Sequence, residues 1–145
     1  MTRKGFGLIT AIVVMITVAT LMTLMMSLSS SSVKTTVDVY LKEQSELLAR
    51  SATEYALLAI SGHNNSNNCI QNIDIGYPEA NPTHEANLTI WYIGTSIPNC
   101  AGSILDNNIT TPESNLTAII DVVVNVVAPG ITEPIRVHRR TIQKP

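Results

Sequence analysis

The residues that could do chemistry are few and scattered along this chain of 145 residues. The three histidines, His63, His84 and His138, show no spacing typical of metal ligands. The sequence has no glycine-rich phosphate loop, no GxSxG motif and no nucleophile with a base close to it in the sequence. We therefore expect neither an enzyme nor a bound cofactor.

An oxygen-rich turn is the one candidate for a cation site. Its possible ligands are Asp106, Asn107, Asn108, Thr110 and Glu113. The turn lacks the glycine and the ligand spacing of a calcium-binding loop, and asparagine-rich turns are common in proteins. We predict no metal site, with calcium at this turn as the alternative.

Cys69 and Cys100 are the two cysteines of the chain, and they do not form a CxxC pair. In an oxidising compartment, one disulfide between them is the simplest account. In a reducing compartment they would be two unrelated buried thiols. We expect the disulfide, which would help to hold the loops of a small domain.

The charge of the chain argues against a nucleic-acid-binding protein. The formal net charge is -2, so the sequence lacks the basic footprint that binds phosphates. Arg136, Arg139 and Arg140 fall on a predicted strand, where we interpret them as a solvated face rather than a DNA contact.

The elements that position these residues begin with one apolar stretch. No Asp, Glu, Lys, Arg or His occurs from Gly5 to Val33, and 17 of the 23 residues from Phe6 to Leu28 are apolar. A helix of that length spans about 35 Å, enough to cross a hydrocarbon core of about 30 Å. Because Arg3 and Lys4 precede the stretch, its start is expected to stay cytoplasmic and the rest of the chain to lie outside.

The leader RKGFGLIT, from Arg3 to Thr10, resembles the cleavage region of type IV pilins and type II secretion pseudopilins. In that family a short basic leader ends in glycine and an aromatic or apolar residue begins the mature chain. The resemblance implies that a prepilin peptidase of the inner membrane cuts between Gly5 and Phe6 and methylates the new amine of Phe6. A secretory signal peptide cut near Ser30–Val33 is the alternative.

Thr10 departs from the family pattern. Most members carry a glutamate at this fifth mature position, where it pairs with the N-terminal amine of a neighbouring subunit. A charge inside a membrane is costly unless it is paired, so a chain with threonine neither needs nor offers that pairing. Within the family the glutamate is missing chiefly from certain minor subunits, so the resemblance implies a minor, tip or priming subunit.

Small hydroxyl residues recur along one side of the apolar helix: Thr10, Thr17, Thr20, Thr23 and Ser27. Small residues on one side allow helices to approach closely in lipid, and the hydroxyls can bond either a partner or their own helix. We predict that this side packs against the helices of other subunits.

The helix is expected to continue, with an amphipathic pattern, to Ser61, with Gly62 following its end. Its apolar face is predicted to lie on a small domain. That face comprises Val33, Val37, Tyr40, Leu41, Gln44, Leu47, Leu48, Ser51, Tyr55, Leu58 and Ala59. The predicted organisation is a leader at 1–5, a transmembrane half at 6–28, an amphipathic half at 29–62 and a β-rich domain at 63–145.

The C-terminal domain alternates β-branched runs with turn signals, which predicts strands at about 69–75, 87–94, 118–128 and 134–142. The third is the strongest and is predicted to be central, with the fourth as its hairpin partner. The fold class is therefore α+β, with a long N-terminal helix packed on an antiparallel sheet of about four strands. The pilin architecture is similar.

Two functions from different classes follow. The first is a minor pilin or pseudopilin, a structural subunit that assembles with other such subunits into a periplasmic or cell-surface filament. The second is a single-pass, signal-anchored binding module outside the cytoplasm, for which the helix is only an anchor.

Overall fold

The computed structural model describes residues 4–64, 68–95, 97, 100, 102–109, 116–129, 131 and 133–145, and for residues 4–6 only the backbone. The chain divides into two compact units, residues 1–37 and 38–145. Each unit is described by itself below.

One helix, α1 (Lys4–Gly62), contains every described residue of the first unit and continues into the second. Its hydroxyl-rich stretch is helical, and two of its side chains bond back to the preceding turn: Thr35 Oγ1 donates to the Ser31 carbonyl at 3.0 Å and Thr36 Oγ1 to the Ser32 carbonyl at 2.9 Å. The helix ends at Gly62, and the His63 N–H donates to the Ile60 carbonyl at 3.3 Å. The predicted helix and its end are confirmed.

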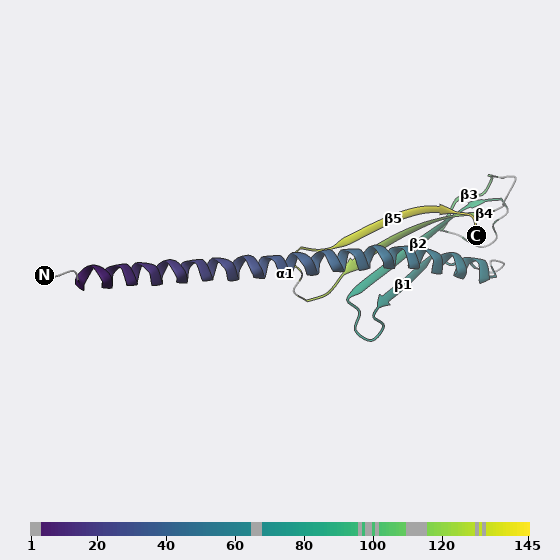
Figure 1. Cartoon of the computed structure of the whole chain (residues 1–145). Coiled ribbons are helices and arrows are strands. Elements are labelled where there is room, and N and C mark those ends of the chain that lie inside the picture. The colour runs from purple at the N-terminus through teal and green to yellow at the C-terminus, as the bar shows by residue number, and fades with distance from the viewer. Residues whose placement is uncertain are drawn as a thin grey trace. The chain divides into compact units, whose positions relative to one another are not determined.

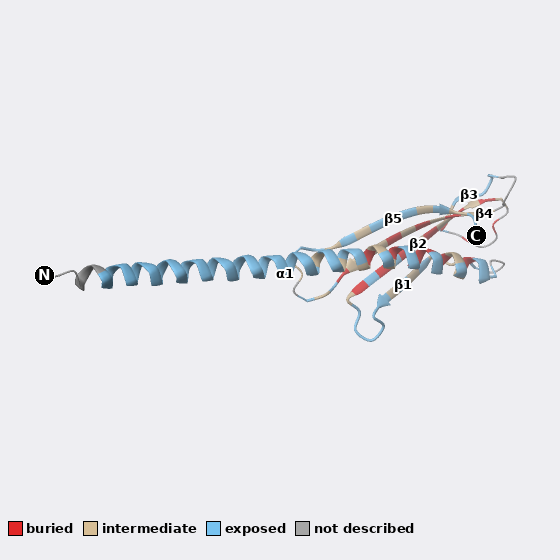
Figure 2. Ribbon diagram, in the orientation of Figure 1, coloured by how far each residue is buried: buried red, intermediate tan, exposed pale blue. Residues whose placement is uncertain are grey.

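In the first unit, every described side chain of α1 is exposed, as Figure 2 shows by its unbroken pale blue. One segment of α1, close to the N-terminus, is long and apolar enough to cross a membrane, and none of it is buried within the protein. The segment differs in this respect from the core helix of a globular domain, which buries its apolar side chains.

The second unit holds a five-stranded sheet within the described residues, which agrees with the α+β prediction. Its strands are β1 (Asn72–Tyr77), β2 (His84–Gly94), β3 (Ile104–Asp106), β4 (Leu116–Val126) and β5 (Arg136–Gln143). The order is β1-β2-β4-β5, with every neighbour antiparallel, and β3 pairs with β2 in parallel. β4 is central and pairs with β5 as predicted, and in Figure 1 it lies between β2 and β5.

Burial alternates along the two central strands. In β2 and β4 the even-numbered residues are buried and the odd-numbered ones are half-buried or exposed, apart from the half-buried Leu116. Leu88 lies opposite Val122 on the buried face, and Thr89 lies opposite Asp121 on the other face. One face of the sheet thus forms the core and the other carries polar groups, as expected when a helix covers a single face.

The helix buries a different stripe from the predicted one. Its fully buried side chains are Ser45, Ala49, Ala52, Thr53, Ala56 and Ile60. They belong to the same core as Leu88, Ile90 and Tyr92 of β2, and Figure 2 shows the red segments of α1 against the strands. Tyr40, Leu47, Tyr55 and Leu58 instead stay exposed, at 61%, 63%, 54% and 71%.

The prediction of that face is therefore wrong by about one residue, or about 100° around the helix. The physical reason is side-chain size. The strands already supply bulky side chains such as Ile90, Tyr92 and Ile120, so the helix packs against them with small side chains, among them alanine and serine. Leu41 and Leu48 lie at the margin of this contact and are half-buried.

Cys69 and Cys100 form a disulfide, with their Cα atoms 5.1 Å apart, within the range that suits such a bond. Nearby, the Tyr92 hydroxyl donates to the Ile70 carbonyl at 2.8 Å, and burial raises the pKa of Tyr92 to about 12. The disulfide closes a loop with a sequence separation of 31 residues. In the chain-entropy model a loop of that size contributes about 3–4 kcal/mol.

Candidate subunit-packing surfaces

The hydroxyl side of α1 is the first candidate surface, and all five of its predicted residues are exposed in the first unit. Its threonines donate to carbonyls three residues earlier in the same helix. The bonds run from Thr10 to Gly7 (3.0 Å), Thr17 to Val14 (2.9 Å), Thr20 to Thr17 (2.8 Å) and Thr23 to Thr20 (2.8 Å). Of the two possibilities that the sequence leaves open, the structure shows bonding to the helix itself.

This bonding decides how the threonine side can behave in lipid. A hydroxyl that needed an outside partner would be costly in hydrocarbon, whereas a hydroxyl bonded to its own backbone is already satisfied. What such a side presents to a neighbour is a row of methyl groups on short side chains. The surface is thus apolar in effect, and it allows a second helix to approach closely.

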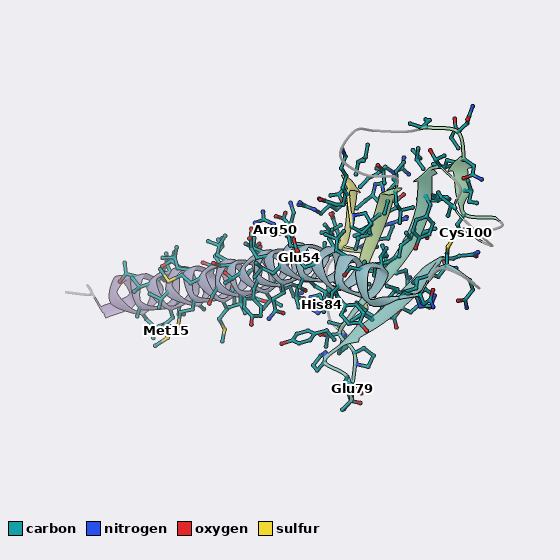
Figure 3. All side chains as sticks on the ribbon, turned by 90° about the vertical axis from the view of Figure 1, so that its right-hand side faces the viewer. Met15, Arg50, Glu54, Glu79, His84 and Cys100 are labelled. Carbon is teal, nitrogen blue, oxygen red and sulfur yellow. A yellow bond between two sulfur atoms is a disulfide. The ribbon has the colours of Figure 1, made fainter. Side chains whose placement is uncertain are left out.

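Methionines line the opposite side of the same helix, a feature that the sequence analysis did not single out. Met15, Met22, Met25 and Met26 are exposed at 73%, 63%, 70% and 77%; Met15 is labelled in Figure 3. At about 100° per residue they centre roughly 170° away from the hydroxyl residues. Methionine is unbranched and adaptable, so the two sides differ in shape and stiffness although both are apolar. Helical-wheel spacing of the methionines would have revealed this side.

The second candidate surface is the exposed apolar stripe of α1 in the second unit: Tyr40, Leu47, Tyr55 and Leu58. A groove of about 430 Å³ includes Leu47 of this stripe and is lined by Gln44, Leu47, Leu48, Ser51 and Tyr77. The Gln44 amide donates to the Tyr40 hydroxyl at 2.7 Å, so the polar groups at the edge of the stripe satisfy each other. Large side chains left exposed at helical spacing are typical of a protein-contact surface.

The outer face of the sheet carries a charge cluster centred on Asp121. Arg140 binds its Oδ2 through Nη2 at 2.5 Å and Nε at 3.2 Å, and His138 Nε2 bonds its Oδ1. Arg140 also lies over the ring of Trp91, 5.8 Å from the centroid. Burial tends to raise the pKa of Asp121, but the hydrogen bonds and charges of Arg140 and His138 outweigh it and hold the pKa below its usual value.

No metal centre is formed by the described residues, since no group of three or more His, Cys, Asp or Glu side chains comes together there. In the candidate calcium turn, the Asp106 carboxylate accepts the Asn108 N–H at 2.9 Å, and Asn107 Oδ1 accepts the Ile97 N–H at 3.0 Å. These oxygens hold the turn itself. Thr110 and Glu113 lie outside the described residues.

The predicted processing site lies at the start of α1. The helix begins at Lys4, so the backbone of Gly5 and Phe6 is in its first turn. The side chains of both residues, and residues 1–3 of the leader, lie outside the described part. A peptidase that cuts here has to open the first helical turn, which is the least stable part of a helix because its N–H groups have no intrahelical partners.

Comparison of the chain with models of protein families, with curated proteins and with solved structures gives no significant match. Any functional assignment therefore depends on the geometry described above and on the motif at the N-terminus.

Proposed function

We propose that the chain is a minor pilin or pseudopilin, a structural subunit of a type IV pilus or type II secretion filament. The observation that carries this proposal is the single helix α1, which is wholly exposed and uncharged over residues 7–33 and buries a stripe of small residues against an antiparallel sheet farther along. It supports a subunit that is first held in the inner membrane and then packs through its helix.

The exposed stripe of Tyr40, Leu47, Tyr55 and Leu58 favours this proposal over the alternative of an anchored binding module. A plain anchor accounts for an apolar segment inside the membrane. It does not account for large apolar side chains left open to water on the helix of the sheet domain. A subunit whose helix packs against other subunits needs such a stripe.

Thr10 supports a minor position in the filament, at the tip or in priming. Its hydroxyl donates to the Gly7 carbonyl, and it offers no carboxylate to a neighbour's N-terminal amine. A subunit without that charge depends on the apolar sides of its helix for recognition.

The test is co-expression with a prepilin peptidase, followed by mass spectrometry of the intact chain and of its N-terminal peptide. The expected product begins at Phe6 and carries one methyl group on its amine. Gly5→Val is the matched control and is expected to block cleavage while the chain still enters the membrane. An intact N-terminus, or a cut near Ser32, contradicts the proposal and favours the alternative function, an anchored binding module.

A further inference from the structure

After residue 50, the basic residues gather at one edge of the sheet, and three of the acidic residues lie at or next to the opposite edge. Asp106 on β3, Asp121 on β4 and Glu133 shortly before β5 lie elsewhere. Residues 51–135 contain no lysine or arginine, and Arg136, Arg139, Arg140 and Lys144 then lie on β5 or directly after it. At the other edge, acidic residues occupy β1, the turn that follows it and the start of β2. These residues are Asp74, Glu79 and Glu85.

Several of these charges have no partner in the part of the chain that the structure describes. Both ion pairs on β5 end on Asp121 and involve His138 and Arg140. Five other exposed, charged side chains form no ion pair and no side-chain hydrogen bond with any described residue. They are Arg136 and Arg139 at one edge, and Asp74, Glu79 and Glu85 at the other.

Both edges are also open along their backbones. β1 and β5 end the strand order β1-β2-β4-β5, so among the described strands each pairs on one side only. Three antiparallel steps separate them, which makes β1 and β5 antiparallel to each other. Figure 1 shows them at opposite sides of the sheet, and Figure 3 shows Glu79 extending from the turn after β1.

When two copies of the chain meet, edges of the same charge repel each other and edges of opposite charge attract each other. Two β5 edges brought together would place arginines beside arginines, and two β1 edges would place carboxylates beside carboxylates. We propose that the β5 edge of one copy docks beside the β1 edge of a second copy, with Arg136 and Arg139 facing Asp74, Glu79 and Glu85. The contact is heterologous, so it joins two unlike edges and leaves one basic and one acidic edge of the pair uncovered.

Exposed ion pairs contribute little each, about 0–1 kcal/mol, so this contact sets the orientation and order of neighbours rather than holding them together. The inference rests on the proposed function in one respect: the helices have to hold the copies close to each other in the membrane. Charge complementarity then selects the head-to-tail arrangement over both symmetric ones.

The experiment uses the full chain in lipid vesicles at low salt, with a single new cysteine in each copy. The Glu79→Cys chain and the Arg139→Cys chain carry different affinity tags. They are mixed and then cross-linked with a short bismaleimide. Cys69 and Cys100 do not react because they are bonded to each other. We expect the mixed Glu79→Cys with Arg139→Cys product to exceed each like-with-like product at least fivefold. At about 1 M salt, where the Debye length is about 3 Å, the excess is expected to disappear.

Charge reversal sharpens the test. Adding Arg136→Glu to the Arg139→Cys chain is expected to abolish the excess, and adding Asp74→Lys to its Glu79→Cys partner is expected to restore it. Glu54→Cys, on the exposed side of α1, replaces Glu79→Cys as the matched control. Near-ultraviolet circular dichroism shows that each variant is folded.

Equal like-with-like products, an excess that resists salt and charge reversal, or the absence of any cross-link would each overturn the proposed contact. Failure of the proposed function has a separate readout, the N-terminal mass. A chain cleaved at Phe6 without the mixed product refutes only the edge contact, and the mixed product with an uncleaved N-terminus refutes only the pilin assignment.

Discussion

The Nε2 atom of His84 lies 3.2 Å from the carbonyl oxygen of Leu41, which joins the first residue of β2 to the helix that covers the sheet. A carbonyl oxygen can only accept, so Nε2 carries a proton. On the other side of the ring, Nδ1 lies 2.9 Å from Thr83 Oγ1, so both ring nitrogens are satisfied although the side chain is fully buried. The Leu41 carbonyl also accepts from Ser45 Oγ at 2.8 Å.

We expect His84→Ala to destabilise the sheet domain by about 2–3 kcal/mol, because it removes a buried hydrogen bond and leaves a cavity. His84→Gln keeps an N–H donor and is expected to recover part of this loss. Urea unfolding of the full chain in detergent, followed by the fluorescence of Trp91, measures both effects. The exposed neighbour Glu85→Ala is the control, with an expected change below about 0.5 kcal/mol. An equally small change for His84→Ala contradicts this role.

The buried stripe of α1 gives a second prediction. Ala52 is 1% exposed against the sheet, so Ala52→Leu overpacks the core and should cost about 1–3 kcal/mol. Leu58 is 71% exposed, so Leu58→Ala should leave the stability almost unchanged and instead weaken co-purification with other filament subunits. Thermal unfolding and pull-down assays on the same pair of variants separate the two roles. A large loss of stability for Leu58→Ala would contradict this assignment, because it would mean that the stripe with Leu58 packs against the sheet.

Asp121 makes the stability of the domain depend on pH. Its pKa is lower in the folded protein than the ordinary value of 3.8. A depressed pKa contributes stability that is fully present above the unfolded value and is lost as the pH falls through the folded value. We expect Asp121→Asn to remove this contribution, about 1 kcal/mol at neutral pH, and to flatten the loss of stability below about pH 4.

The measurement for Asp121 is urea unfolding from pH 6 down to pH 2.5 for the wild type and for Asp121→Asn. All other carboxyl groups titrate in both chains, so the difference between the two curves isolates Asp121. The difference should be constant above about pH 4 and shrink below it. A difference that is the same at all pH values would show that the cluster contributes through packing alone.

The threonine side of α1 gives the fourth prediction. Thr17→Leu with Thr20→Leu widens the helix on the side that we expect to pack against other helices, and should weaken association in lipid roughly tenfold. Met22→Leu with Met26→Leu, on the opposite side, keeps the volume nearly unchanged and serves as the matched control. Resonance energy transfer between labelled chains in vesicles reports the association. If both double variants associate like the wild type, the threonine side does not form the contact.

The sequence was sufficient to predict those elements whose patterns are long and local. The run of β-branched residues from Ala118 to Val127 predicted the central strand β4, and the uncharged stretch after Gly5 predicted the first part of α1. β3 was missed because three residues, Ile104–Asp106, form a strand only through their pairing with β2, which no local pattern encodes. Strand pairing at this distance is a tertiary effect.

The error in the buried face of α1 has a different origin. Periodicity finds an apolar stripe, and the leucines and tyrosines of that stripe outweighed the alanines beside it. The choice between two neighbouring stripes depends on the shape of the opposing surface, here the large side chains of β2 and β4. The Asp121 cluster was missed in the same way, because the register of β4 with β5 brings Asp121 opposite Arg140.

The backbone-bonded threonines of α1 also bear on how easily this segment changes its surroundings. The hydroxyls of Thr17, Thr20 and Thr23 have a partner in the preceding turn, which moves with them wherever the helix goes. Moving the helix from lipid to a protein environment, or back, therefore breaks none of the hydrogen bonds of these hydroxyls. These hydroxyls therefore favour neither environment. The direction of the transfer depends on how well the helix packs and on any force applied to it.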